Sequence, residues 1–169
     1  GDLVIDVAGH SVTRDGKTTY VQMSYLNGYA KVDMATGKVL KQVEIPMSDY
    51  AKEHFKTKDD YPLNSAFHGM AINGAETKLC MAGTIDNYSV IASVPAMTTD
   101  RILPAGSKPY WVSTSSDGKR CYVSNSESND LSVVDFESAT EVARVPVGKY
   151  PQRSRLATVP AAVIDNLKN

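Results

Sequence analysis

The chain has 169 residues, of which 42% are hydrophobic and 22% charged, and its formal net charge is −1 at pH 7. This composition excludes a disordered segment and is typical of one folded domain. The near-neutral balance gives no reason to expect a nucleic-acid partner. No apolar run approaches the roughly 20 residues of a membrane-spanning helix. No basic stretch followed by an apolar one opens the chain, so we expect a signal peptide to be absent or already removed.

A repeat of 42 residues organises the chain, as in the pair Asn87 and Asn129. The run Asp117–Val123 (DGKRCYV) matches Asp15–Val21 (DGKTTYV), which lies 102 residues earlier because about 18 residues are inserted between the first and second copies. Each copy alternates apolar and polar residues in four short segments separated by turn residues, which predicts four antiparallel strands. A period of about 40–45 residues with four strands per unit indicates an all-β propeller.

The predicted elements begin with Asp2–Ala8, expected to be the last strand of a preceding blade. At the other end, Arg153–Val159 is expected to be the first strand of a following blade. Residues 1–160 then form the propeller part and are followed by a C-terminal tail. The repeat copies occupy about 9–46, 65–106 and 107–148. The insertion occupies 46–64, and the tail occupies 161–169. The strands of the third copy are expected at Tyr110–Ser115, Arg120–Ser124, Leu131–Phe136 and Glu141–Val147.

The insertion is expected to contain a short helix, because Ser48 is a good helix-capping residue. Tyr50, Ala51, His54 and Phe55 fall on one side of this helix. It would lie at the mouth of the central channel as a lid, a docking element or a rim decoration. His54 is a candidate ligand-binding residue, and packing beside Phe55 is the alternative.

The third copy carries the residues that suggest a family. Tyr122–Asn125 (YVSN) follows an Asp-Gly turn and precedes Asn129–Asp135 (NDLSVVD), and this arrangement resembles the YVTN β-propeller repeat. Val145–Pro151 (VPVGKYP) is similar to the linker between blades of that family. The family includes cell-surface proteins, lactonase-like enzymes and propellers that carry or serve redox cofactors. The resemblance therefore implies the fold and a secreted or periplasmic location rather than one activity.

The number of strands predicts an incomplete ring. Three copies and two terminal strands give about 14 strands, half of the roughly 28 in a seven-bladed ring. An open half would leave blade faces and strand edges in water. We therefore expect a second polypeptide to supply the remaining blades, and a fragment or a small four-bladed ring is the alternative.

The first strand of each propeller blade lines the central channel, so residues at its start converge. The offset of 42 places His68, Tyr110 and Gln152 at this position, and His10 joins them if two residues are missing before the first turn. His68, His10 and Tyr110 are the candidate catalytic residues, because an imidazole can donate or accept a proton near neutral pH. Phe67–Met70 resembles the Pro-His-Gly-Val motif of ligand-binding propellers, with Phe in place of Pro.

Polar residues follow in the fourth, incomplete copy. Gln152, Arg153 and Arg155 are candidate binding residues for a small anionic or carbonyl-bearing ligand. Trp111 is expected to be wedged between blades. The three histidines lack zinc-type spacing, so no metal site is predicted.

Cys80 and Cys121 lie on the second strands of adjacent blades, one register apart. We expect both to be buried free thiols, and a bond across the blade interface is the alternative. Asp33 and Asp135 share one repeat position, which favours a role in turns.

Two functions are consistent with these residues. The first is half of a propeller enzyme that acts on a small polar or anionic ligand, with histidine as acid or base, in a hydrolase, lyase or redox subunit. The alternative is a non-catalytic binding or scaffold propeller. We favour the enzyme because His10 and His68 both stand at blade starts and a potential lid is inserted between them. No P-loop, GxSxG or dinucleotide fingerprint is present, so no cofactor is indicated.

Overall fold

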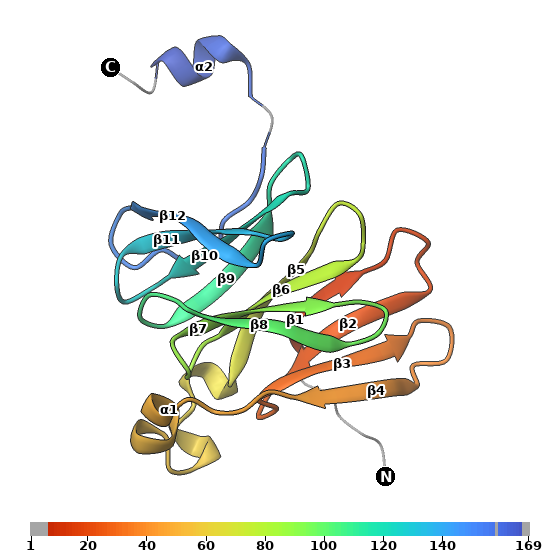
Figure 1. The fold of residues 1–169 in the computed structure, drawn as a ribbon. Helices are drawn as coiled ribbons and strands as arrows, with labels where there is room; N and C mark the ends of the chain where they lie inside the picture. The colour runs from red at the N-terminus through yellow and green to blue at the C-terminus, as the bar shows by residue number, and fades with distance from the viewer. Residues whose placement is uncertain (1–6, 158, 167–169) are drawn as a thin grey trace.

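The computed structural model describes residues 7–157 and 159–166 and consists of three four-stranded antiparallel sheets (Figure 1). Each sheet contains four consecutive strands in sequence order, which is the arrangement of propeller blades. Blade 1 comprises β1 (Val7–Val12), β2 (Thr18–Met23), β3 (Gly28–Asp33) and β4 (Val39–Glu44). Blade 2 comprises β5 (Phe67–Ile72), β6 (Lys78–Gly83), β7 (Tyr88–Ser93) and β8 (Thr98–Pro104). Blade 3 comprises β9 (Pro109–Thr114), β10 (Arg120–Asn125), β11 (Asp130–Asp135) and β12 (Thr140–Pro146). The predicted strands of the third copy are confirmed to within one residue.

Short side chains that bond to the backbone fix the turns. Asp117 accepts hydrogen bonds from the Ser115 hydroxyl and from the Lys119 N–H, and Asp15 has equivalent partners in blade 1. Gly118 has φ +71°, a left-handed conformation that glycine adopts without a steric cost. These local bonds explain why the repeated Asp-Gly pairs mark the hairpins between the first and second strands of blades 1 and 3.

The predicted turn role of Asp33 and Asp135 is confirmed. Asp33 accepts a hydrogen bond from the Thr36 N–H at 2.8 Å, and Asp135 accepts one from the Ser138 N–H at 2.7 Å. An aspartate that bonds to the backbone a few residues ahead stabilises a tight turn. The two residues therefore close the turns between the third and fourth strands.

The core lies between blades, because each blade presents alternate side chains to its two neighbours. Leu79 and Met81 belong to the cluster between blades 1 and 2, whereas Cys80 and Ala82 belong to the cluster between blades 2 and 3. The first strands β1, β5 and β9 lie side by side (Figure 1). This arrangement places their side chains along one inner face of the molecule.

The insertion folds as α1 (Asp49–His54) and two 3-10 turns, η1 (Lys58–Asp60) and η2 (Pro62–Asn64). Ser48 caps α1, as predicted, by accepting a hydrogen bond from the Ala51 N–H. Ala51 is buried against the core between blades 1 and 2, but Tyr50 and His54 are exposed. The expected common apolar face is therefore wrong for those two, because the helix is short and only its middle reaches the core.

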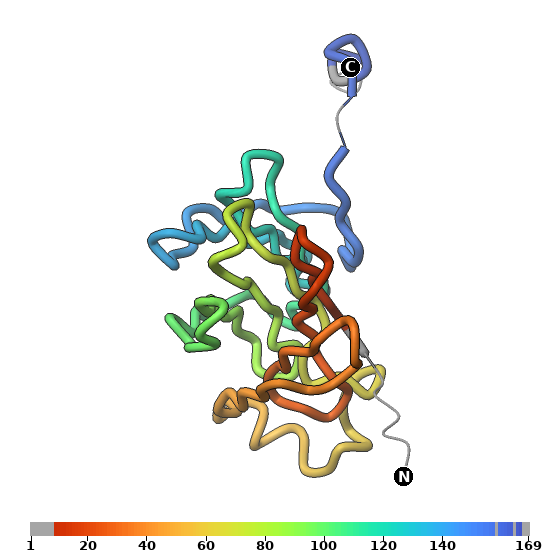
Figure 2. Tube along the Cα trace, turned by 90° about the vertical axis from the view of Figure 1, so that its right-hand side faces the viewer, coloured from red at the N-terminus to blue at the C-terminus, as the bar shows by residue number. Residues whose placement is uncertain are grey.

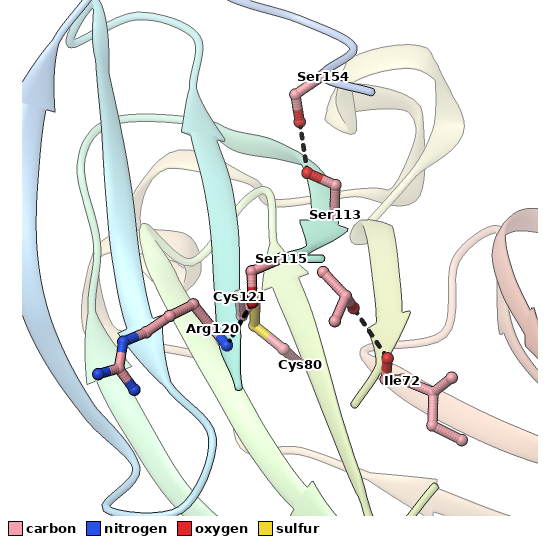
Figure 3. The surroundings of a disulfide bond; sticks show 8 residues. Ile72, Cys80, Ser113, Ser115, Arg120, Cys121 and Ser154 are labelled. Atoms are coloured by element: carbon pink, nitrogen blue, oxygen red, sulfur yellow. Dashed lines mark hydrogen bonds between the residues drawn. A yellow bond between two sulfur atoms is a disulfide. The ribbon is translucent and has the colours of Figure 1, made fainter. Parts of the chain in front are cut away.

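Cys80 and Cys121 form a disulfide between β6 and β10, so the expectation of free thiols is wrong (Figure 3). Cys80 faces forward into the interface between blades 2 and 3. Cys121 occupies the repeat position of Leu79, which faces backward into the preceding interface. A forward-facing and a backward-facing residue on adjacent blades meet when they are one register apart, and the Cα atoms here are 6.4 Å apart.

The two predicted terminal strands have different outcomes. Most of Asp2–Ala8 lies outside the described residues, and its last two residues begin β1. The described part of Arg153–Val159 is not a strand, which corrects the prediction. Among the described residues, no second strand lies beyond this segment to pair with it. It nevertheless runs beside β9, where the Ser113 and Ser154 hydroxyl oxygens are 2.9 Å apart (Figure 3).

The tail contains α2 (Ala161–Asn166), which stands apart from the blades in both views (Figures 1 and 2). No helix in the described part of the chain is both long and apolar enough to span a bilayer.

Candidate functional site

A cleft of about 250 Å³ lies on the inner face, where β1, β5, β9 and the segment after Pro151 come together. The first strands of neighbouring blades contact one another, and two glycines let these strands approach closely. A Cβ on Gly69 would lie 2.7 Å from the Tyr110 carbonyl oxygen, and one on Gly9 would collide with the His68 carbonyl. Lining the cleft are Gly9, His10, His68, Gly69, Met70, Trp111, Val112, Arg153 and Arg155.

His68 stands at the centre of an aromatic group. Its ring stacks on Tyr110 with the centroids 4.1 Å apart, and it meets Trp111 edge-on at 4.3 Å. The Arg153 guanidinium lies 4.5 Å from the centre of the Trp111 ring, a cation–π contact. Nδ1 of His68 and Nε1 of Trp111 are both buried and have no hydrogen-bond partner among the described residues. The aromatic stack therefore orients His68 and holds Arg153 over the cleft.

The environment of His68 keeps its imidazole neutral. Burial and then the nearby Arg153 charge lower the pKa of His68 from 6.5 to about 4, and the backbone of Tyr110 opposes this shift. At neutral pH His68 therefore offers one donor and one acceptor nitrogen. A negative charge bound beside it would offset Arg153 and raise this pKa.

The side chains around the cleft have a strong bias toward positive charge. Arg153 and Arg155 are exposed at its edge, and His10 and His68 line its walls. None of the described residues lining the cleft is a carboxylate. This combination attracts anions, because two guanidinium groups provide several fixed donors and no acid among the described lining residues competes for them.

The structure corrects the position expected for His10. His10 pairs with Val21 in β2, as Met70 pairs with Met81 in β6, so His10 is equivalent to Met70 rather than to His68. The two residues assumed to be missing before the first turn of blade 1 are therefore not missing, because the two hairpins have the same length. His10 still lines the same cleft as His68.

The remaining predicted residues have separate positions. Tyr110 is buried beneath His68, and its hydroxyl has no partner among the described residues. Gln152 is exposed and does not line the cleft. His54 bonds through Nδ1 to the Tyr50 carbonyl and stacks on the Tyr50 ring, away from His68.

Sequence reasoning missed Trp111 as a cleft residue. Trp111 follows Tyr110 directly and has the repeat position of Gly69. A large aromatic residue at a position otherwise occupied by glycine was the available signal. In the described residues, no three His, Cys, Asp or Glu side chains come together in a group that could hold a metal ion.

The comparison with solved structures supports the fold. No protein-family model matches the sequence, and no curated protein sequence matches it. Hydrazine synthase of Kuenenia stuttgartiensis is similar in structure, with a TM-score of 0.68 and 17% identity over 89% of this chain and 39% of that one. A protein of unknown function from Desulfotomaculum acetoxidans has a TM-score of 0.65 and 13% identity, over 86% of this chain and 44% of that one. The chain spans less than half of either neighbour, and identities this low indicate a shared fold alone.

Proposed function

We propose that this chain is part of a β-propeller that binds a small anionic ligand in the cleft around His68. The observation that carries the proposal is that two arginines and two histidines, and no carboxylate, are found among the described residues that line the cleft. Trp111 Nε1 and His68 Nδ1, which are buried without partners in the described part of the chain, add hydrogen-bonding capacity. A carboxylate or phosphate group is the ligand chemistry that these side chains recognise.

His68 is the proposed proton-transfer group of an enzyme of the hydrolase, lyase or redox-subunit type. Its low pKa makes it a weak base in the free protein. A bound anion would raise that pKa toward neutrality, so substrate binding itself would prepare the acid–base group. His10 and Arg155 would position the substrate, and Arg153 would fix its negative charge.

A scaffold propeller without catalysis is the second candidate, favoured by the same low pKa. In a scaffold of this kind, the neutral imidazole of His68, stacked on Tyr110, would orient the ligand and transfer no proton. Turnover distinguishes the two functions, because the scaffold binds the anion and releases it unchanged.

Titration of the purified full-length protein with inorganic phosphate and with acetate, followed by calorimetry, tests the proposal. We expect saturable binding of at least one of them that weakens about tenfold or more in Arg153→Gln, since a hydrogen-bonded charge pair is lost. Arg101→Gln is the matched control, because Arg101 is exposed on the outer strand β8. Absence of saturable binding, or equal weakening in both variants, would refute the anion site.

We further propose that additional blades complete the ring, supplied by a second polypeptide. Cys80, Ile91 and Leu103 of blade 2 are buried against blade 3. Their repeat equivalents in blade 3 are Tyr122, Val133 and Val145. Tyr122 and Val133 are half-buried, and Val145 is exposed. An apolar face that repeats an established interface supports the docking of another blade, in a ring we propose to be seven-bladed.

The disulfide supports a secreted or periplasmic location. Such bonds persist in oxidising compartments and are rare in the reducing cytosol. Cys80 and Cys121 join adjacent blades rather than a reactive surface loop, which favours a structural bond formed in an oxidising environment.

A further inference from the structure

A second cleft, of about 270 Å³, lies where the insertion meets the loops of blades 2 and 3. It shares no lining residue with the cleft around His68. We name it the insertion cleft. Its lining residues are Tyr50, Phe55, Asp60, Pro62, Thr84, Asn87, Lys108 and Glu127.

The insertion provides an aromatic wall. The rings of Tyr50 and Phe55 meet edge-on with their centroids 6.4 Å apart, and Phe55 packs in the same way on Tyr61 at 6.0 Å. The buried Ala51 anchors this part of the insertion to the core. The wall therefore offers hydrocarbon and aromatic surface held in a fixed place, suited to the apolar body of a small ligand.

The net charge of the side chains that line the insertion cleft is negative, because Lys108 pairs with Glu127 and Asp60 remains. The Lys108 ammonium is 3.3 Å from a Glu127 carboxylate oxygen and 5.6 Å from the centre of the Tyr150 ring, so its charge is compensated. Asp60 accepts backbone N–H bonds from Lys56 and Thr57 through Oδ2. These bonds help to hold the pKa of Asp60 below its usual value. Asp60 thus contributes a carboxylate that no cation of the described residues neutralises.

Thr84 provides an unpaired polar group in the wall formed by blade 2. This residue is only 2% exposed, and its buried hydroxyl has no hydrogen-bond partner among the described residues. Buried hydroxyl groups in proteins are almost always satisfied, by protein atoms, water or ligand. An N–H donor in the cleft would satisfy it after rotation of the hydroxyl.

We propose that the insertion cleft binds a small organic ammonium ion. Its charge would meet Asp60 and the Thr84 hydroxyl, and its hydrocarbon part would lie against Tyr50 and Phe55, which also attract cations through their ring faces. An anion is disfavoured by the carboxylate of Asp60, which no cation of the described residues neutralises. The proposal is independent of the anion site around His68, because the two clefts are lined by different residues.

Titration of the full-length protein with butylammonium chloride, followed by calorimetry and NMR, tests this site. Butanol and sodium butyrate are matched ligands that keep the hydrocarbon but lack the positive charge. We expect saturable binding of butylammonium only, and a loss of about tenfold in affinity in Asp60→Asn. Asp59→Asn is the control, because Asp59 is the neighbouring carboxylate in η1 but does not line the cleft.

Thr84→Val removes the hydroxyl and keeps the shape, so it tests the second contact without an expected loss of stability. We expect weaker butylammonium binding with an unchanged unfolding midpoint. Three results would overturn the proposal: no saturable binding of butylammonium, equal binding of butanol, or equal affinity losses in the Asp60 and Asp59 variants. Phosphate binding measured on the same samples reports separately on the site around His68.

Discussion

His68 shows how much of a side chain's chemistry is determined by its neighbours. Its place at the start of a first strand follows from the repeat of 42 residues. Its stacking on Tyr110, and the Arg153 charge that lowers its pKa, depend on contacts between separate blades. Spacing along the chain can predict the first property but not the second.

We predict that the His68 imidazole titrates near pH 4 in the free protein and at higher pH with saturating phosphate. Because the folded pKa lies below the unfolded value of 6.5, the unfolded state binds more protons between these values. His68 therefore lowers stability as the pH falls from 6.5 toward 4, and its effect is constant above that window. NMR titration of the ring protons measures the pKa directly.

Arg153→Gln provides the control for this titration. Removal of the guanidinium should raise the pKa of His68, whereas Arg101→Gln should leave it unchanged. A pKa near 6.5 in the free protein, unaffected by phosphate, would contradict the description of the cleft as buried and cationic.

At the scale of strands and turns, the sequence predicts what is determined locally. The Asp-Gly hairpins and the helix after Ser48 depend on side chains bonding within a few residues, and the structure has them where expected. The assumed loss of two residues before the first turn is wrong, because His10 and Val21 have the same separation along the chain as their equivalents Met70 and Met81. That assumption, rather than the repeat spacing itself, aligned His10 with His68 instead of Met70.

The disulfide was only the alternative to free thiols in the sequence prediction, because repeat positions do not show which interface a residue faces. Matching by repeat position compares residues that face the same way, whereas a bond across an interface joins residues that face opposite ways. Cys80 faces forward and Cys121 backward, so their offset of 41 residues rather than 42 brings them together.

We predict that Cys80→Ala combined with Cys121→Ala lowers the free energy of unfolding by about 2–4 kcal/mol, the range expected for a bond that closes a loop of this size. Urea unfolding under oxidising conditions measures the loss. Reductant should destabilise the parent protein and leave the double variant unchanged. Equal stability of parent and variant in the absence of reductant would show that the bond does not form in solution.

At the scale of the whole molecule, three blades form an open arc. Blade 3 presents Tyr122, Val133 and Val145 on a face that in blade 2 is covered by its neighbour. The segment after Pro151 runs beside β9 as a first strand would, but without a second strand in the described part of the chain. The exposed face and this unpaired segment both indicate where a further blade would join.

The central claim is that these blades belong to a larger ring, and native mass spectrometry of the purified 169-residue chain tests it most directly. We predict that the chain occurs in assemblies heavier than 18.3 kDa, because the exposed apolar face of blade 3 would be covered by a further blade. A monodisperse species of 18.3 kDa that unfolds in one cooperative transition would contradict the claim.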